Sequence, residues 1–487
     1  MSTDQTSTTT GVVHTEEEAG FRQGLRPRQI QMIAIGGAIG TGLFMGAGGR
    51  LADAGPALVL VYALCGFFAF LVLRALGELI VHRPSSGSFV SYAREFYGEK
   101  MAFAAGWLYW LNWAMTSVAD VTAVGLYMNF FKQYVDWLAP IDQWVFAMIA
   151  LLLVLGMNLL SVTVFGELEF WFALVKVVAL VTFLVVGICF VVLGTPVDGH
   201  QPGLSLITDN GGLFPHGVLP AFVIMQGVVF AYASIELVGT AAGETANARE
   251  VMPRAVRTVI IRLAVFYVGS VLLLTLLLPA SSYSAGESPF VTFFGSIGVE
   301  GADVVMNLVV LTAVLSSLNA GLYSTGRILH SMAVSGSAPA ALARMNGNGV
   351  PSGGIAVTAV VTAFGVVLNA IVPSQAFEIA LNLSALGIIS AWAVIILCQL
   401  RLWQRARQGL LERPSFRLFG APWTGLLTLV FLLAVLVLMA VDGPVGTWTV
   451  ASIGLIGPAL VVGWFCCRGR IAAIAAERGE HLERSLE

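Results

Sequence analysis

Four glycines fall within seven positions, 36–42, at the centre of the first long apolar stretch of the chain. Glycine weakens a helix because it has no side chain and keeps the most backbone freedom, so a run this dense predicts a break in the helix. Unpaired amide and carbonyl groups are unfavourable in lipid unless they face protein or a water-filled cavity. The run therefore predicts a cavity at membrane depth or, as the alternative, a stripe of small residues for close helix packing.

A second apolar segment, 227–239, contains a carboxylate, Glu236, about midway along the chain. In transporters built from inverted repeats, two discontinuous helices in corresponding positions meet at the substrate site. A glycine-interrupted first helix and a polar-interrupted sixth helix fit that arrangement. The two interruptions together favour a carrier.

The composition indicates an integral membrane protein. The 487 residues are 57% hydrophobic and 11% charged, with a mean hydropathy of +0.86, whereas soluble domains are about 25% charged. The expected fold is all-α with twelve transmembrane helices, a five-plus-five inverted-repeat core in which helices 1 and 6 are broken, and two peripheral helices. The segments of spanning length are 29–52, 57–80, 102–130, 143–163, 166–193, 218–243, 258–280, 303–333, 353–372, 376–400, 423–441 and 447–467.

Charge and polarity divide the chain into a core and flanking parts. The predicted parts are a disordered tail at 1–24, the transport core at 25–400, a basic loop at 401–421, the peripheral helices at 422–467 and a second tail at 468–487. Most of the 25 Lys and Arg residues fall in the tails and in alternate loops. By the positive-inside rule both termini are expected in the cytoplasm, with the protein in the bacterial inner membrane.

The five cysteines indicate neither disulfides nor a metal site. All lie within or at the end of apolar spans, where cysteine acts as a small hydrophobe: Cys65, Cys189, Cys398, Cys466 and Cys467. No cofactor is expected, and no basic, aromatic-rich surface suggests nucleic acid. The expected partners are membrane lipids, protons and a small solute, with no obligate protein partner.

Several polar side chains interrupt the apolar spans. Lys176 lies inside the fifth span, where a buried lysine marks a functional interior or, with nearly equal weight, a structural tether between helices. Asn112, among aromatic residues of the third span, indicates a cavity wall or ordinary core packing. Arg74 and Glu78 are four residues apart and predict an ion pair on one helix face.

Four stretches resemble the amino-acid permeases of the amino acid–polyamine–organocation superfamily over about 24–467. They are the first glycine-containing stretch at 30–37, the loop from His82 to Phe96, the triplet Leu111-Asn112-Trp113, and the segment from Leu206 to Gly212. The first stretch is shared widely in the family. The loop and the 206–212 segment are found in fewer of its members and are therefore more specific.

The resemblance implies a set of site residues. Amides of the first break would hold the substrate carboxylate, at Gly40, Thr41 and Gly42, and carbonyls of both breaks would hold its ammonium, at Ala38, Phe230 and Ala233. Phe230 would also be an aromatic gate, and Lys176 and Glu236 would be candidates for proton coupling. Specificity for the substrate side chain would come from Asn112, Thr116, Tyr232, Ser316, Ser317 and Asn319.

The expected function is proton-coupled import of a small neutral amino acid, asparagine first, by alternating access. The alternatives are a permease or exchanger for serine, alanine, glycine or γ-aminobutyrate, and a sensor that does not transport. An enzyme is disfavoured because no Ser/His or metal-ligand cluster is evident.

Overall fold

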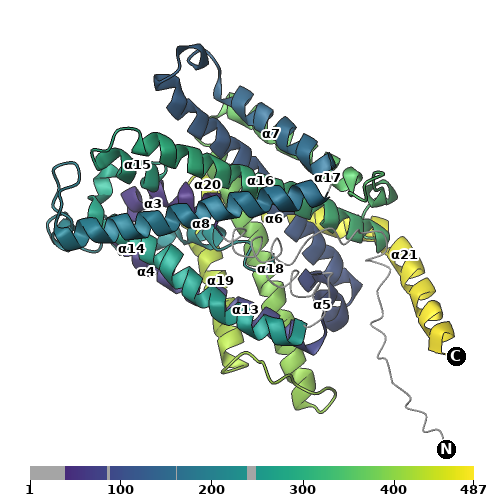
Figure 1. The fold of residues 1–487 in the computed structure, drawn as a ribbon. Helices are drawn as coiled ribbons and strands as arrows, with labels where there is room; N and C mark the ends of the chain where they lie inside the picture. The colour runs from purple at the N-terminus through teal and green to yellow at the C-terminus, as the bar shows by residue number, and fades with distance from the viewer. Residues whose placement is uncertain (1–38, 85–87, 161, 238–247, 487) are drawn as a thin grey trace, which may run out of the picture.

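The computed structural model describes residues 39–84, 88–160, 162–237 and 248–486, and these are overwhelmingly helical (Figure 1). At the centre of the fold, α6 packs against α16, α18 and α7. The yellow helix α21 projects from this body (Figure 1). The α-helices are α2 (Thr41–Phe44), α3 (Gly46–Ala54), α4 (Leu58–His82), α5 (Ser88–Tyr97), α6 (Glu99–Phe130), α7 (Gln143–Leu160), α8 (Val162–Leu193), α9 (Ser205–Thr208), α10 (Val218–Val223), α11 (Met225–Ala231), α13 (Ala248–Arg262), α14 (Ser270–Leu277), α15 (Pro289–Ser296), α16 (Ala302–Val334), α17 (Ser352–Ile371), α18 (Ala376–Arg407), α19 (Trp423–Val441), α20 (Val445–Ala451) and α21 (Ile453–Leu486).

Within the described ranges, nine helical stretches are long and apolar enough to cross a membrane. They correspond to nine of the twelve predicted spans. The other three are the first span, part of which lies outside the described residues, the continuous but more polar α6, and the sixth span, which is divided into α10 and α11. These three spans carry the glycine run, Asn112 and Glu236. The chain is therefore a multi-pass helical membrane protein, and part of its predicted site lies in the three spans that are interrupted, partly described or more polar.

The described part of the first break lies at 39–40, directly before α2. Gly40 is extended, with φ −129° and ψ −164°, and the helix begins at Thr41. A Cβ placed on Gly42 would lie 2.6 Å from the Cα of Ala231, the last residue of α11. The glycine thus permits direct backbone contact between the two interrupted helices.

The second break follows α11, where residues 232–236 form a turn. Ser234 has a φ of 77°, in the left-handed region that side chains other than glycine rarely adopt. Tyr232 fixes the start of this turn, since its ring stacks on Tyr267 at 4.7 Å and its hydroxyl donates to the carbonyl of Tyr62 at 2.8 Å. Tyr267 belongs to a π-helical segment, η5 (Leu263–Gly269), between α13 and α14.

The predicted ion pair between Arg74 and Glu78 is wrong. Glu78 is fully buried and is bound instead by Arg413, whose Nε lies 2.6 Å from Oε1. Arg74 donates to the carbonyl of Arg417 and stacks over the ring of Phe416. The loop between α18 and α19 supplies closer partners than the helix itself does, so this carboxylate fastens the loop to α4.

A second charged contact involves Arg50 of α3. The guanidinium of Arg50 in α3 is buried, donates to the carbonyl of Gly46 and pairs with Glu378 of α18 at 3.4 Å. It lies against Gly227, because a Cβ there would be 1.9 Å from Nη2. The segment α3 is thus joined to both α11 and α18.

Candidate functional site

The start of α2 brings four helices together. The hydroxyl of Thr41 donates to Oδ1 of Asp120 in α6 at 2.5 Å. A Cβ on Gly40 would lie 3.7 Å from Oγ of Ser317 in α16, and Gly42 contacts α11. The structure therefore places Gly40, Thr41, Gly42 and Ser317 in one neighbourhood, with α6, α11 and α16 around the first break.

The amides at the start of α2 suit an anion. The amides of Leu43 and Phe44 donate to the carbonyl of Gly40, at 3.2 and 3.3 Å. The amides of Thr41 and Gly42 have no acceptor within α2, because the first amides of any helix lack an intrahelical partner. A carboxylate is the kind of group that such amides bind.

Lys176 lies in a buried cluster between α8 and α16. Its Nζ donates to Oγ of Ser316 at 2.9 Å, and the Ser316 hydroxyl donates to Oε1 of Glu169 at 2.7 Å. The direct separation of Nζ and Oε1 is 4.0 Å, and the lysine and glutamate side chains are each only 1% exposed. A single hydroxyl thus links a cation and a carboxylate that lie on the same helix.

Glu236 has different partners. It is 2% exposed, and the hydroxyl of Tyr109 in α6 donates to its Oε1 at 3.1 Å. Tyr109 also packs edge-on against Phe89 of α5. The second break is therefore connected to α6 and α5, whereas the hydrogen bonds of Lys176 described above connect α8 with α16.

The residues proposed for specificity divide into groups that face different helices. Asn112 and Thr116 face α18, where Ser384 donates to Oδ1 of Asn112 at 2.9 Å and lies 2.7 Å from the Thr116 hydroxyl. Asn319 faces α7, since Nδ2 of Asn158 donates to its Oδ1 at 2.8 Å. Tyr232 faces α4. In this conformation they do not form one continuous wall beside Thr41.

Of the three residues whose carbonyls are expected to hold the substrate ammonium, the structure describes two. Ala38 lies outside the described residues. Phe230 is buried, and its carbonyl accepts the amide of Ala233 at 2.9 Å, which leaves this oxygen one further lone pair. Phe230 and Ala233 thus lie at the second break, where the first break meets α11.

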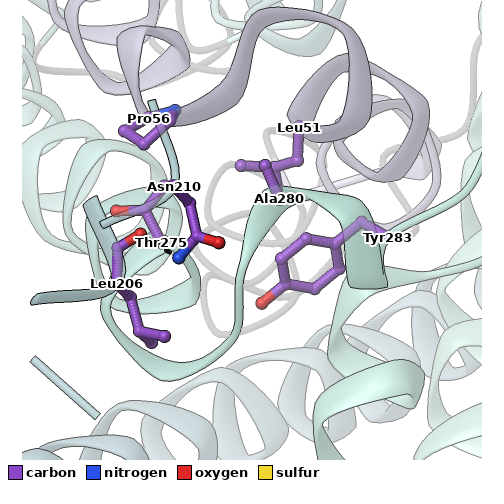
Figure 2. Close-up of a pocket in the computed structure, with 7 residues that line it drawn as sticks. All are labelled: Leu51, Pro56, Leu206, Asn210, Thr275, Ala280 and Tyr283. Carbon is purple, nitrogen blue, oxygen red and sulfur yellow. Dashed lines mark hydrogen bonds between the residues drawn. The ribbon is translucent and has the colours of Figure 1, made fainter. Parts of the chain in front are cut away.

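A small cavity lies away from this site (Figure 2). It occupies about 10 Å³, room for about one water molecule. Asn210, from the 206–212 segment, closes one side and donates to the carbonyl of Leu206. The lining residues are Leu51, Pro56, Leu206, Asn210, Thr275, Ala280 and Tyr283, none of which is a predicted substrate residue. The segment thus packs beside the end of α3.

Comparison with known proteins decides the family. The family model described as amino acid permease matches residues 29–468. The chain belongs to the amino acid permease family. The resemblance expected from the four sequence stretches is confirmed, and the protein is an amino-acid transporter.

Curated relatives of this permease resemble it along nearly their whole length. L-asparagine permease 1 of Mycobacterium tuberculosis is 62% identical over 465 residues, which cover 96% of this chain and 94% of the relative. L-asparagine permease of Escherichia coli strain K12 is 59% identical, covering 94% and 91%. L-asparagine permease of Streptomyces coelicolor is 56% identical, covering 94% and 93%.

Two buried carboxylates of the permease were missed as site residues. Asp120 contacts the first break through Thr41, and Glu169 contacts Lys176 through Ser316. Both are carboxylates inside membrane spans, and the rule that an ionisable residue at this depth marks function applies to them as it does to Lys176. A consistent use of that rule would have found both from the sequence.

Asn112→Leu is expected to weaken asparagine uptake more than alanine uptake, by about tenfold in the ratio, because losing one hydrogen bond to a substrate amide costs about 1.5 kcal/mol. The measurement is the apparent affinity for each amino acid in proteoliposomes. Asn369→Leu is the matched control, since this buried amide of α17 donates to Thr122 and to the carbonyl of Gly365 and not to a proposed specificity residue; it should change stability but not the ratio. Equal losses for both substrates in Asn112→Leu would remove this residue from the specificity site.

Proposed function

We propose that this permease imports L-asparagine together with a proton by alternating access. The choice of asparagine as substrate rests on the name shared by relatives that are 56–62% identical over nearly the whole chain. The amides at the start of α2 would hold the substrate carboxylate, and the carbonyls of Phe230 and Ala233 would hold the ammonium.

Proton coupling is supported by the buried charges around the breaks. Lys176 and Glu236 each lie nine-tenths or more buried and reach a different part of the site. A change of charge on such a residue alters how firmly it binds its neighbours, so protonation can favour one access state over the other.

The arrangement proposed for these elements is a five-plus-five inverted repeat over 25–400, with twelve spans and both termini in the cytoplasm. The close contact of Gly42 with Ala231 supports it, because the two discontinuous helices of such repeats meet at the substrate site. We propose no obligate protein partner.

The test is asparagine uptake by the purified permease in proteoliposomes. Accumulation should rise with an inward proton gradient and should be unchanged when sodium is replaced by choline. Competition by a full set of amino acids should rank asparagine first. Accumulation that requires sodium would contradict the coupling, and stronger competition by serine, alanine or glycine would contradict the substrate. An exchange-only protein would show counterflow but no gradient-driven accumulation.

A further inference from the structure

We propose that Glu169 is the proton acceptor for Lys176 and that the hydroxyl of Ser316 passes the proton between them. The inference rests on the proposed proton coupling and assigns its path to three named side chains. It gives Ser316 a role in proton transfer in place of the substrate contact expected from the sequence.

The geometry of the cluster suits a relay. The two steps, Nζ to Oγ at 2.9 Å and Oγ to Oε1 at 2.7 Å, are both ordinary hydrogen-bond lengths. The direct distance from Nζ to Oε1, 4.0 Å, is too long for a hydrogen bond. The hydroxyl therefore lies on the short route between cation and carboxylate.

Burial keeps the route separate from bulk water. Lys176 is 1% exposed, and Glu169 and Ser316 are fully buried. The second carboxylate oxygen of Glu169, Oε2, is also buried and has no hydrogen-bond partner within the described structure. An ionised carboxylate with one unsatisfied oxygen is unfavourable at this depth, and taking up a proton relieves it.

The transfer conserves atoms and charge. One N–H bond of the Lys176 ammonium breaks as an O–H bond forms on Ser316, and the original O–H bond of Ser316 breaks as one forms on Glu169. An ammonium and a carboxylate become an amine and a carboxylic acid, so the cluster is neutral overall before and after. Asp120 of α6 is the further charged group that acts on Lys176 across this space.

The position along α8 sets a direction. Glu169 precedes Lys176 by two helical turns, about 10 Å along the axis. The start of α8 is the end that the charge distribution predicts to be cytoplasmic. The side chains close this gap to 4.0 Å between Nζ and Oε1, so the proton moves only that far, toward the residue whose backbone lies nearer the end expected in the cytoplasm.

The test compares Glu169→Gln with Glu167→Gln, a matched control two residues earlier in the same helix. Glu169→Gln should reduce gradient-driven asparagine accumulation to the equilibrium level. Asparagine counterflow should stay within about threefold of wild type, and the pH dependence of this counterflow should become flatter. Glu167→Gln should accumulate asparagine normally. Ser316→Ala should behave like Glu169→Gln, and Ser316→Thr, which keeps a hydroxyl, should restore accumulation.

A wild-type measurement keeps the proposal testable if a variant does not fold. A hydrophobic carbodiimide reacts with protonated carboxyls in apolar surroundings, so mass spectrometry should find Glu169 modified, and less so as the pH rises. Accumulation by Glu169→Gln, or an unmodified Glu169 at acidic pH, would overturn the relay. If wild type itself ignores the proton gradient, the proposed function and the relay both fail; if only the Glu169→Gln result is contrary, the relay alone fails.

Discussion

We expect Lys176→Met to abolish concentrative uptake of asparagine while substrate exchange remains measurable. The lysine cation donates to Ser316 and lies 4.0 Å from Glu169. Methionine has a side chain of similar length but no charge, so the substitution removes these interactions. A proton gradient can drive transport only if protonation favours one access state, and a residue without a titratable group provides no such difference. The measurement is accumulation under an inward proton gradient alongside asparagine counterflow in the same proteoliposomes.

The controls separate coupling from stability. Removing one partner of a buried ion pair costs about 3–5 kcal/mol, because the other charge is left unpaired. The double variant Lys176→Met/Glu169→Gln removes both charges and should melt closer to wild type, still without accumulation. Glu236→Gln should alter the pH dependence of uptake more than substrate binding. A Lys176→Met protein that concentrates asparagine under a proton gradient would return this lysine to a purely structural role.

Gly42→Ala should lower uptake by at least tenfold, and Gly42→Val should abolish it. The sequence suggests that a side chain at this position would occupy the space of the substrate carboxylate. The structure adds a second reason, since the new Cβ would lie 2.6 Å from Cα and 3.1 Å from Cβ of Ala231. Backbone atoms cannot swing aside as a long side chain can, so α2 and α11 must separate, at a cost of about 1–3 kcal/mol.

The melting temperature and uptake are measured together to distinguish these two reasons. Loss of packing predicts a lower melting temperature as well as lower uptake, whereas a blocked carboxylate site predicts lower uptake alone. Gly457→Ala is the matched control, because a Cβ there meets nothing within 4 Å. Normal uptake by Gly42→Val would show that the first break has no part in binding.

The sequence predicted the membrane spans and the second interruption well because both depend on local composition. Hydropathy marks a span wherever it lies in the fold, and a carboxylate inside an apolar helix is unfavourable in any context. The turn at 232–236 accordingly contains Glu236, inside the predicted segment. For the first break, the described residues test only the end of the glycine run.

The direction of individual side chains could not be predicted in the same way. Ser317 and Asn319 are two residues apart in α16, so helical periodicity already turns them to different faces, but it does not say that these faces meet Gly40 and Asn158 of α7. Glu78 has a suitably spaced arginine on its own helix but is bound by Arg413, far along the chain. Such choices depend on which helices pack together, and periodicity within one segment contains no information about its neighbours.

The left-handed serine at the second break has a consequence for the populations of the access states. An L-residue in this region costs about 1–2 kcal/mol relative to ordinary helical or extended backbone. Tyr232, stacked on Tyr267 and bonded to Tyr62, holds the start of the turn against α4, so rotation about the break acts on the residues after Ser234. Since about 1.4 kcal/mol is a factor of ten in an equilibrium constant, a conformation in which Ser234 regains a negative φ gains roughly five- to thirtyfold in population from this one dihedral angle.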